Sequence, residues 1–411
     1  MFDLELAWDR PAHTGSYAAE HVLRIRVKPG QTATGGTTLP VRMAIALDNS
    51  GSMEGEKLKS AKEACAAVVG QLRPQDSVRV SAFASKLVPV IAGVSGDSTA
   101  RASAEAALAP LTAEGVTRTD QALEWIEQAL PADPGTVRVG ILITDGHATG
   151  PRGNILGDVK FLVERAGQLG SKGIALFTVG LGSADDFNVA FLDDLSKGAR
   201  GAYLYAHEPS ELEQQLAGRL GSCQTMAIEG ATLSLRPLLN DVQLKGLCRI
   251  RPDFVPMDVG NFIKIGNLRA DVPTDFLVSV MIPPKRLDQP PGSLPVLAVS
   301  LESRDAGSAP QQAAIEYTVA FSRAQQVNSE VNQDRLTWDI NSYADALNRT
   351  TDPNKTGELL TSLGATAQKA GHGGLAQQAF QQLDQLRKSG QLSGHSRSQV
   401  LAQSRNLGGN A

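Results

Sequence analysis

The sequence is poor in cysteine and has no excess of basic residues. It contains only three cysteines among 411 residues, Cys65, Cys223 and Cys248. Three thiols cannot build a disulfide framework, so we expect a reducing, cytoplasmic location. Lys and Arg number 39 against 43 Asp and Glu, which gives a net charge of −4. Because nucleic acids and anionic membranes attract strongly basic proteins, this balance excludes a global basic surplus and we expect no nucleic-acid partner, with a local basic patch as the open alternative.

The sequence also lacks a long apolar run. No stretch reaches the roughly 18 apolar residues that cross a bilayer. Near the start, Asp3 and Glu5 stand where a secretory signal carries basic residues, so we expect no secretion by the usual route. The remaining composition, 42% apolar and 20% charged, is typical of a globular protein, and the length suits two or three domains.

Residues 40–220 alternate apolar strands with amphipathic helices. The predicted strands are 41–47, 77–84, 87–92, 136–144, 173–180 and 202–205. The predicted helices are 57–72, 99–109, 120–130, 156–169, 186–196 and 210–220. This alternation predicts a doubly wound, Rossmann-like α/β domain, with a mostly parallel sheet covered by helices on both faces.

The segments on either side of this domain have different patterns. Short strands separated by Pro, Gly and Asp predict a β-sandwich over residues 221–325, and the alternating run 315–321 could close it. We expect the N-terminal strands of residues 1–39 to pair into this sandwich, so that the α/β domain is inserted next to it. Residues 326–411 predict a C-terminal helical segment with a frayed tail rich in Ser, Gly, Asn and Gln.

The most informative motif directly follows the buried strand 41–47. It reads Asp48-Asn49-Ser50-Gly51-Ser52, one carboxylate and two hydroxyls around a glycine that permits a tight bend. In a doubly wound sheet the carboxyl ends of the strands line the ligand crevice. The motif is therefore predicted to lie at a ligand-binding edge of the sheet. The competing interpretation, that Asp48 only stabilises a turn or caps a helix, would explain this aspartate taken by itself.

Two further segments bring polar side chains to the same edge. The strand 136–144 is followed by Asp145, and the loop before the helix 120–130 contains Thr117 and Thr119. Two carboxylates, several hydroxyls and room for water suit Mg²⁺, which prefers oxygen ligands in octahedral geometry. The set has no soft ligand for zinc or copper. A ligand from outside, ideally a carboxylate, would complete the shell.

These motifs resemble the von Willebrand factor A (VWA) domain with its metal-ion-dependent adhesion site (MIDAS). The resemblance implies a Mg²⁺ ion, with Mn²⁺ or Ca²⁺ as alternatives, and it assigns the metal ligands as Asp48, Ser50, Ser52, Thr117 and Asp145. The family commonly has two glycines before the threonine, where this sequence has Gly-Val. Thr119 is therefore a second candidate. The wider layout is similar to bacterial stand-alone VWA proteins.

The resemblance also implies a function. A partner protein would supply an acidic side chain to the metal, so the chain is predicted to be an adhesion-type interaction module rather than an enzyme. The residues expected to contact the partner are Asn49, Met53, Glu54, Arg118 and His147. A solvent-exposed loop position is the competing interpretation of each.

Two other functions are compatible with the same motifs. Some VWA relatives work beside AAA+ ATPases, as in metal chelatases, so an ATPase or a signalling protein is an alternative partner. A Mg²⁺-dependent hydrolase is the third alternative, because a bound metal can activate water. No general base is paired with the motif, and the scattered histidines and cysteines support no catalytic pair. We therefore predict no catalytic residues.

Overall fold

The computed structural model describes residues 2–13, 17–29, 38–184, 186–284, 292–303, 311–317, 326–405 and 407. The chain forms two compact units. The first unit comprises Met1–Thr37, Ala227–Lys388 and Gln403–Ala411, and the second comprises Thr38–Met226 and Ser389–Ala402. Among the described residues, no helix is long and apolar enough to span a membrane.

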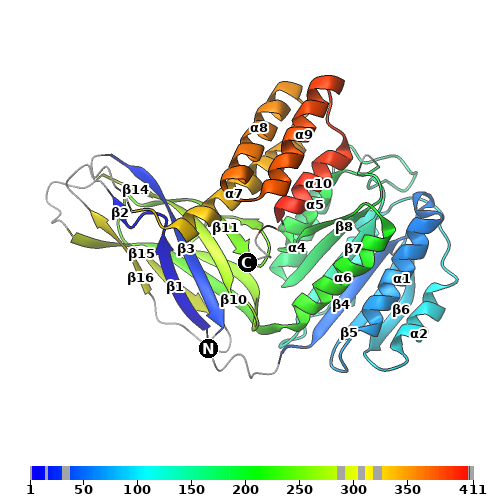
Figure 1. The fold of residues 1–411 in the computed structure, drawn as a ribbon. Coiled ribbons are helices and arrows are strands. Elements are labelled where there is room, and N and C mark those ends of the chain that lie inside the picture. Colours follow the sequence, from blue (N-terminus) through cyan, green and yellow to red (C-terminus); the bar gives the residue numbers. More distant parts are fainter. Residues whose placement is uncertain are drawn as a thin grey trace. The chain divides into compact units, whose positions relative to one another are not determined.

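The second unit is built on a six-stranded sheet with the order β6-β5-β4-β7-β8-β9 (Figure 1). Its strands are β4 (Val41–Asp48), β5 (Ser77–Phe83), β6 (Leu87–Ser95), β7 (Val137–Thr144), β8 (Ile174–Leu181) and β9 (Tyr203–Ala206). Only β6 runs antiparallel to its neighbour. Strand β4 is buried along its length except at Arg42, as expected of a parallel strand covered on both faces.

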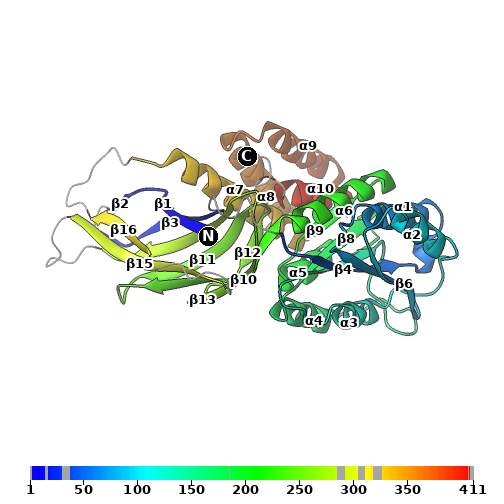
Figure 2. The same ribbon diagram turned by 90° about the horizontal axis from the view of Figure 1, so that it is seen from below.

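Helices cover both faces of this sheet, α1 and α6 on one and α3 and α4 on the other (Figure 2). The helices of the unit are α1 (Glu56–Gly70), α2 (Ala100–Leu108), α3 (Thr119–Ala129), α4 (Lys160–Ser171), α5 (Val189–Gly198) and α6 (Pro209–Gln224). A short 3-10 helix, η1 (Gly51–Met53), precedes α1. The doubly wound α/β domain predicted for this part of the chain is therefore present.

The first unit contains two five-stranded sheets whose apolar side chains share one core. One sheet consists of β1 (Phe2–Trp8), β3 (Ala19–Pro29), β14 (Thr274–Ile282), β11 (Gln243–Arg251) and β12 (Val255–Met257). The other consists of β13 (Phe262–Arg269), β10 (Met226–Pro237), β15 (Gly292–Glu302), β16 (Gln311–Tyr317) and β2 (Ala12–His13). The predicted strand 315–321 corresponds in part to β16, and its residues 318–321 lie outside the described part of the chain.

The chain leaves the first unit and returns to the same sheet. Strand β3 pairs with β14 in an antiparallel register that places Ile25 opposite Phe276. Both side chains are fully buried. All strands of the six-stranded sheet lie between β3 and β14 in sequence, so this sheet is inserted into the fold of the first unit.

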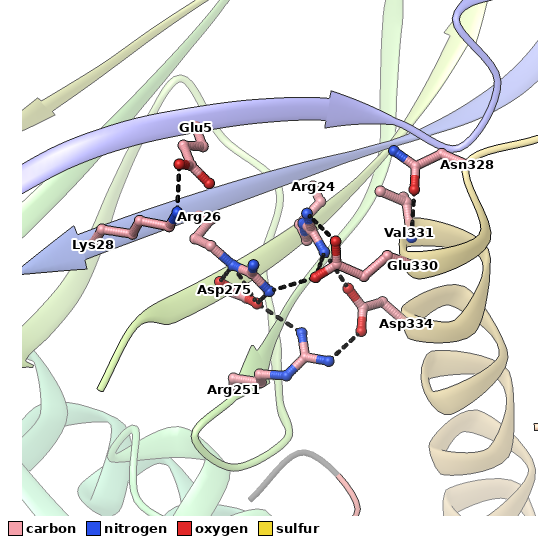
Figure 3. A network of polar contacts seen from close by, with 10 residues as sticks. All are labelled: Glu5, Arg24, Arg26, Lys28, Arg251, Asp275, Asn328, Glu330, Val331 and Asp334. Carbon is pink, nitrogen blue, oxygen red and sulfur yellow. Dashed lines mark hydrogen bonds and ion pairs between the residues drawn. The ribbon is translucent and has the colours of Figure 1, made fainter. Parts of the chain in front are cut away.

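Three helices follow the sheets: α7 (Ser329–Arg349), α8 (Pro353–Lys369) and α9 (Gly373–Ser389). An ion-pair network attaches α7 to strands β3, β11 and β14 (Figure 3). Asp275 is fully buried and accepts hydrogen bonds from Arg26 (2.8 Å, Nη2 to Oδ2) and Arg251 (2.6 Å, Nη1 to Oδ2). The other end of the Arg251 guanidinium binds Asp334 of α7 at 2.6 Å.

Asp275→Ala is expected to lower the free energy of unfolding by about 3–5 kcal/mol, because it removes the buried carboxylate that Arg26 and Arg251 share and leaves them only Glu330 and Asp334. The matched control is Glu5→Ala, which removes the ion pair between Glu5 and Lys28. Both of these side chains are half-exposed (Figure 3). That change should cost less than about 1 kcal/mol. Equilibrium urea unfolding measures both, and equal losses would contradict this account of the network.

Two predictions about helices are wrong. The predicted helix 156–169 begins only at Lys160, and its predicted first residue, Leu156, belongs to a small hairpin of residues 148–156. The tail predicted to fray contains helix α10 (Gly394–Arg405). Its Val400 and Leu401 are fully buried, and Ser398 Oγ lies 2.8 Å from the Tyr203 hydroxyl. The predicted C-terminal segment 326–411 is also divided, since its residues 389–402 belong to the second unit.

Candidate metal centre

Asp48 ends strand β4 at the carboxyl edge of the six-stranded sheet and is fully buried. Its Oδ1 accepts a hydrogen bond from the Ser50 backbone N–H at 2.8 Å. Its Oδ2 accepts one from the Thr144 hydroxyl at 2.6 Å. Leu47 of β4 is in register with Ile143 of β7, so the next residues along the two strands, Asp48 and Thr144, are adjacent. The strand register therefore fixes the orientation of this carboxylate.

A chain of hydroxyls connects Asp48 to the second carboxylate. Ser50 Oγ lies 3.1 Å from Ser52 Oγ, and the Ser52 hydroxyl donates to Asp145 Oδ1 at 2.7 Å. Asp145 directly follows β7 and is fully buried. The residues of the first motif and the aspartate that lies far from it in sequence therefore form one polar cluster.

Thr117 reaches this cluster through the loop before α3. Gly115 adopts a φ of +83°, which favours glycine, and its carbonyl accepts a hydrogen bond from Gly51 N at 3.2 Å. A Cβ added to Gly146 would lie 3.4 Å from Thr117 Oγ1 and 3.5 Å from Ser52 Oγ. Both hydroxyls thus border the space in front of Gly146. The structure brings all five predicted ligands together at one end of the sheet.

The donor set has the chemistry that a hard divalent cation requires. It consists of two carboxylates and three hydroxyls, and oxygen ligands of this kind suit Mg²⁺. Within the described ranges, no group of three or more His, Cys, Asp or Glu side chains is arranged to hold a metal. Any cation here would therefore depend on the hydroxyls of Ser50, Ser52 and Thr117, and the side chains present fit such an ion.

The charge state of Asp48 reflects its surroundings. Burial raises the pKa of its carboxyl to about 6, and the nearby Asp145 charge acts in the same direction. Hydrogen bonds from Thr144 and Ser50 oppose this shift without cancelling it. A cation bound beside the carboxylate would favour its charged form, so metal and protons compete for Asp48.

Two residues of the cluster were not predicted from the sequence. Thr144 is the polar last residue of an apolar strand, and that break in the pattern was an available signal. Lys57, in the first turn of α1, places Nζ 2.6 Å from Asp145 Oδ2 and 3.9 Å from Asp186. No motif distinguishes it from other helical lysines. It neutralises one oxygen of Asp145, while Ser52 binds the other.

The five residues predicted to contact a partner differ in their exposure and in the groups that they bind. Met53 is fully buried in the core of the second unit, so its prediction as a partner contact is wrong. Asn49 is 5% exposed, and its amide donates to the Thr112 carbonyl at 3.0 Å, which turns this side chain inward as well. Arg118 binds Asp120 through two hydrogen bonds. Glu54 is exposed and His147 partly exposed, so both are accessible.

Part of the chain matches a known family. Residues 43–217 match the model of the von Willebrand factor type A domain. An uncharacterised protein of Synechocystis is 24% identical over 289 residues, which cover 67% of this chain and 64% of that protein. Human inter-alpha-trypsin inhibitor heavy chain H4 is 29% identical over 196 residues, 44% of this chain and 20% of its own length. The chain thus spans less than two thirds of either relative.

Two solved structures share the fold over nearly the whole chain. A von Willebrand factor type A protein from Catenulispora acidiphila superposes with a TM-score of 0.76 at 16% identity, over 98% of this chain and 96% of its own. The ArnB paralog VWA2 from Sulfolobus acidocaldarius gives a TM-score of 0.61 at 15% identity, over 99% of each chain. At these identities the likeness concerns the fold alone.

Proposed function

Because residues 43–217 form a von Willebrand factor type A domain, in general a protein-interaction module, we propose that this chain captures an acidic side chain of a partner protein through a bound Mg²⁺ ion. The observation that carries the proposal is the convergence of Asp48, Ser50, Ser52, Thr117 and Asp145 at one edge of the sheet. A binding role alone, without catalysis, accounts for all five residues.

The arrangement suits capture because its own negative charge is limited. Asp48 and Asp145 supply two negative charges, and Lys57 offsets part of the charge on Asp145. The three hydroxyls that complete the set are neutral. A divalent ion held by these residues would retain affinity for a further anionic oxygen, and this is the chemistry that it supplies when bound. Mn²⁺ and Ca²⁺ offer the same chemistry and are included in the proposal.

The first test is thermal unfolding with and without Mg²⁺, on the wild-type chain and on Ser50→Ala. A ligand that binds only the native state adds about 2.7 kcal/mol of stability at a hundredfold excess over its Kd. We expect Mg²⁺ to raise the Tm of the wild type and not of Ser50→Ala. Equal Tm values with Mg²⁺ and with EDTA in the wild type would count against the metal.

The second test concerns the partner. A phage-displayed random peptide library is selected on the wild-type chain in Mg²⁺ and eluted with EDTA. We expect the eluted peptides to be enriched in Asp and Glu, because a carboxylate would complete the metal shell. The same selection on Ser50→Ala should give no such enrichment. Recovery of acidic peptides from both proteins alike would contradict capture through the metal.

A further inference from the structure

The small hairpin of residues 148–156 is joined to the loop that carries Thr117. Thr149 donates two hydrogen bonds to the Thr117 carbonyl, from its backbone N–H at 2.9 Å and from its hydroxyl at 3.1 Å. At the tip, a Cβ on Gly153 would lie 3.0 Å from Val116 Cγ1. Base and tip therefore both contact the residues that position this predicted ligand.

One face of the hairpin carries an exposed apolar side chain. Thr149 and Ile155 form an antiparallel bridge, and the Leu156 N–H donates to the Ala148 carbonyl at 3.0 Å. Directly opposed residues of an antiparallel pair project to the same face. Ile155 therefore lies on the face where the Thr149 side chain reaches Thr117, and it is 62% exposed. An isolated exposed isoleucine needs no explanation, but this one is paired with Thr149, which binds the backbone carbonyl of the predicted ligand Thr117.

The tip of the hairpin carries a positive charge. Arg152 is exposed and is the single charged residue among residues 148–156. It forms no ion pair with any residue in the part of the chain that the structure describes. By contrast, the Arg118 side chain, which directly follows Thr117 in sequence, forms an ion pair with Asp120. Arg152 is thus available to an acidic group from outside.

We infer that this hairpin determines which acidic segment binds: the partner presents a large apolar side chain next to the carboxylate that reaches the metal, and a second acidic residue for Arg152. The inference rests on the proposed function and specifies its partner. Ile155 supplies the apolar contact, and Arg152 supplies the charge complementarity. An apolar residue beside the carboxylate adds discrimination that a metal–carboxylate bond cannot provide, because that bond is the same for every acidic side chain.

The test uses the same peptide selection, now on the wild-type chain, Ile155→Ser and Arg152→Gln. Wild-type peptides should combine Asp or Glu with an adjacent large apolar residue. Ile155→Ser should retain the acidic enrichment and lose the apolar one, and a synthetic peptide of the wild-type consensus should bind it about tenfold more weakly. Arg152→Gln should lose the preference for a second acidic residue.

The controls separate this inference from the proposed function. Phe262→Ser removes an apolar side chain that is 73% exposed in the first unit, and it should leave the consensus unchanged. The Mg²⁺-induced rise in Tm should persist in Ile155→Ser, because its side chain is no ligand. Acidic enrichment without an apolar neighbour in the wild type, or an unchanged consensus in Ile155→Ser, would overturn the inference alone. Absence of any EDTA-eluted acidic peptide from the wild type would overturn the proposed function.

Discussion

Asp48→Asn is expected to abolish Mg²⁺ binding and yet leave the metal-free protein as stable as the wild type, within about 1 kcal/mol, or more stable. The neutral amide cannot balance a divalent cation. It can still keep the local hydrogen bonds, since its oxygen accepts from Ser50 N and its amide can donate to Thr144 Oγ1, which is a donor and an acceptor. Loss of metal binding without loss of fold is the expected pattern.

The sign of the stability effect follows from the pKa of Asp48. The folded pKa, about 6, lies above the ordinary value of 3.8, so the folded state binds the proton more tightly. The favourable contribution of this carboxyl is therefore present below about pH 4 and is lost as the pH rises through about 6. At neutral pH the buried charge is a cost that the Asn variant does not carry.

Titration calorimetry with Mg²⁺ and thermal unfolding in EDTA measure the two effects. Asp384→Asn, which changes an aspartate 67% exposed on α9, is the matched control and should alter neither. A variant that keeps wild-type Mg²⁺ affinity would show that Asp48 is not a ligand. A variant that fails to fold in EDTA would show that Asp48 is structural, and the account of its charge would be wrong.

Gly146→Ala is expected to weaken Mg²⁺ binding by about a hundredfold or more, which corresponds to roughly 2.7 kcal/mol. The added methyl group would lie 3.4 Å from Thr117 Oγ1 and 3.5 Å from Ser52 Oγ. These distances are ordinary contacts for the folded chain. A cation about 2.1 Å from the same oxygens needs the space in front of them, so the methyl group would obstruct it.

Gly157→Ala is the matched control, because a Cβ at that glycine meets nothing within 4 Å. Both variants should unfold in EDTA at temperatures close to the wild type. Calorimetric titration should then show weak Mg²⁺ binding in Gly146→Ala alone. Unchanged affinity in Gly146→Ala would place any metal away from the hydroxyls of Ser52 and Thr117.

Strand periodicity and strand ends predicted the α/β domain and the cluster at its edge. Asp48 and Asp145 follow runs of apolar residues, and the register of β4 with β7 places these runs side by side. The position of Thr117 depended on the resemblance, since the sequence alone also allowed Thr119. Thr119 is buried as the first residue of α3. The local sequence pattern therefore predicted which edge of the sheet carries the polar cluster. The resemblance to the VWA family indicated which threonine of the loop before α3 belongs to it.

Contacts between segments far apart in sequence could not be predicted. Lys57 reaches Asp145 because the first turn of α1 lies next to the residue that follows β7, and no property of the helix sequence distinguishes that lysine from the others. Met53 looks like a loop residue, but η1 turns its side chain into the core. Helix α10 has few apolar residues and little amphipathic pattern. Its Val400 and Leu401 are buried by residues far away in sequence, and the helix sequence alone does not indicate those contacts.

The most direct test of the metal centre is an anomalous diffraction map from a crystal of the full chain soaked in Mn²⁺. We expect one strong peak within coordination distance of the hydroxyls of Ser50, Ser52 and Thr117, and no peak there in Asp48→Asn. A peak at another position, or none in the wild type at saturating Mn²⁺, would contradict the proposal that this edge of the sheet binds a divalent cation.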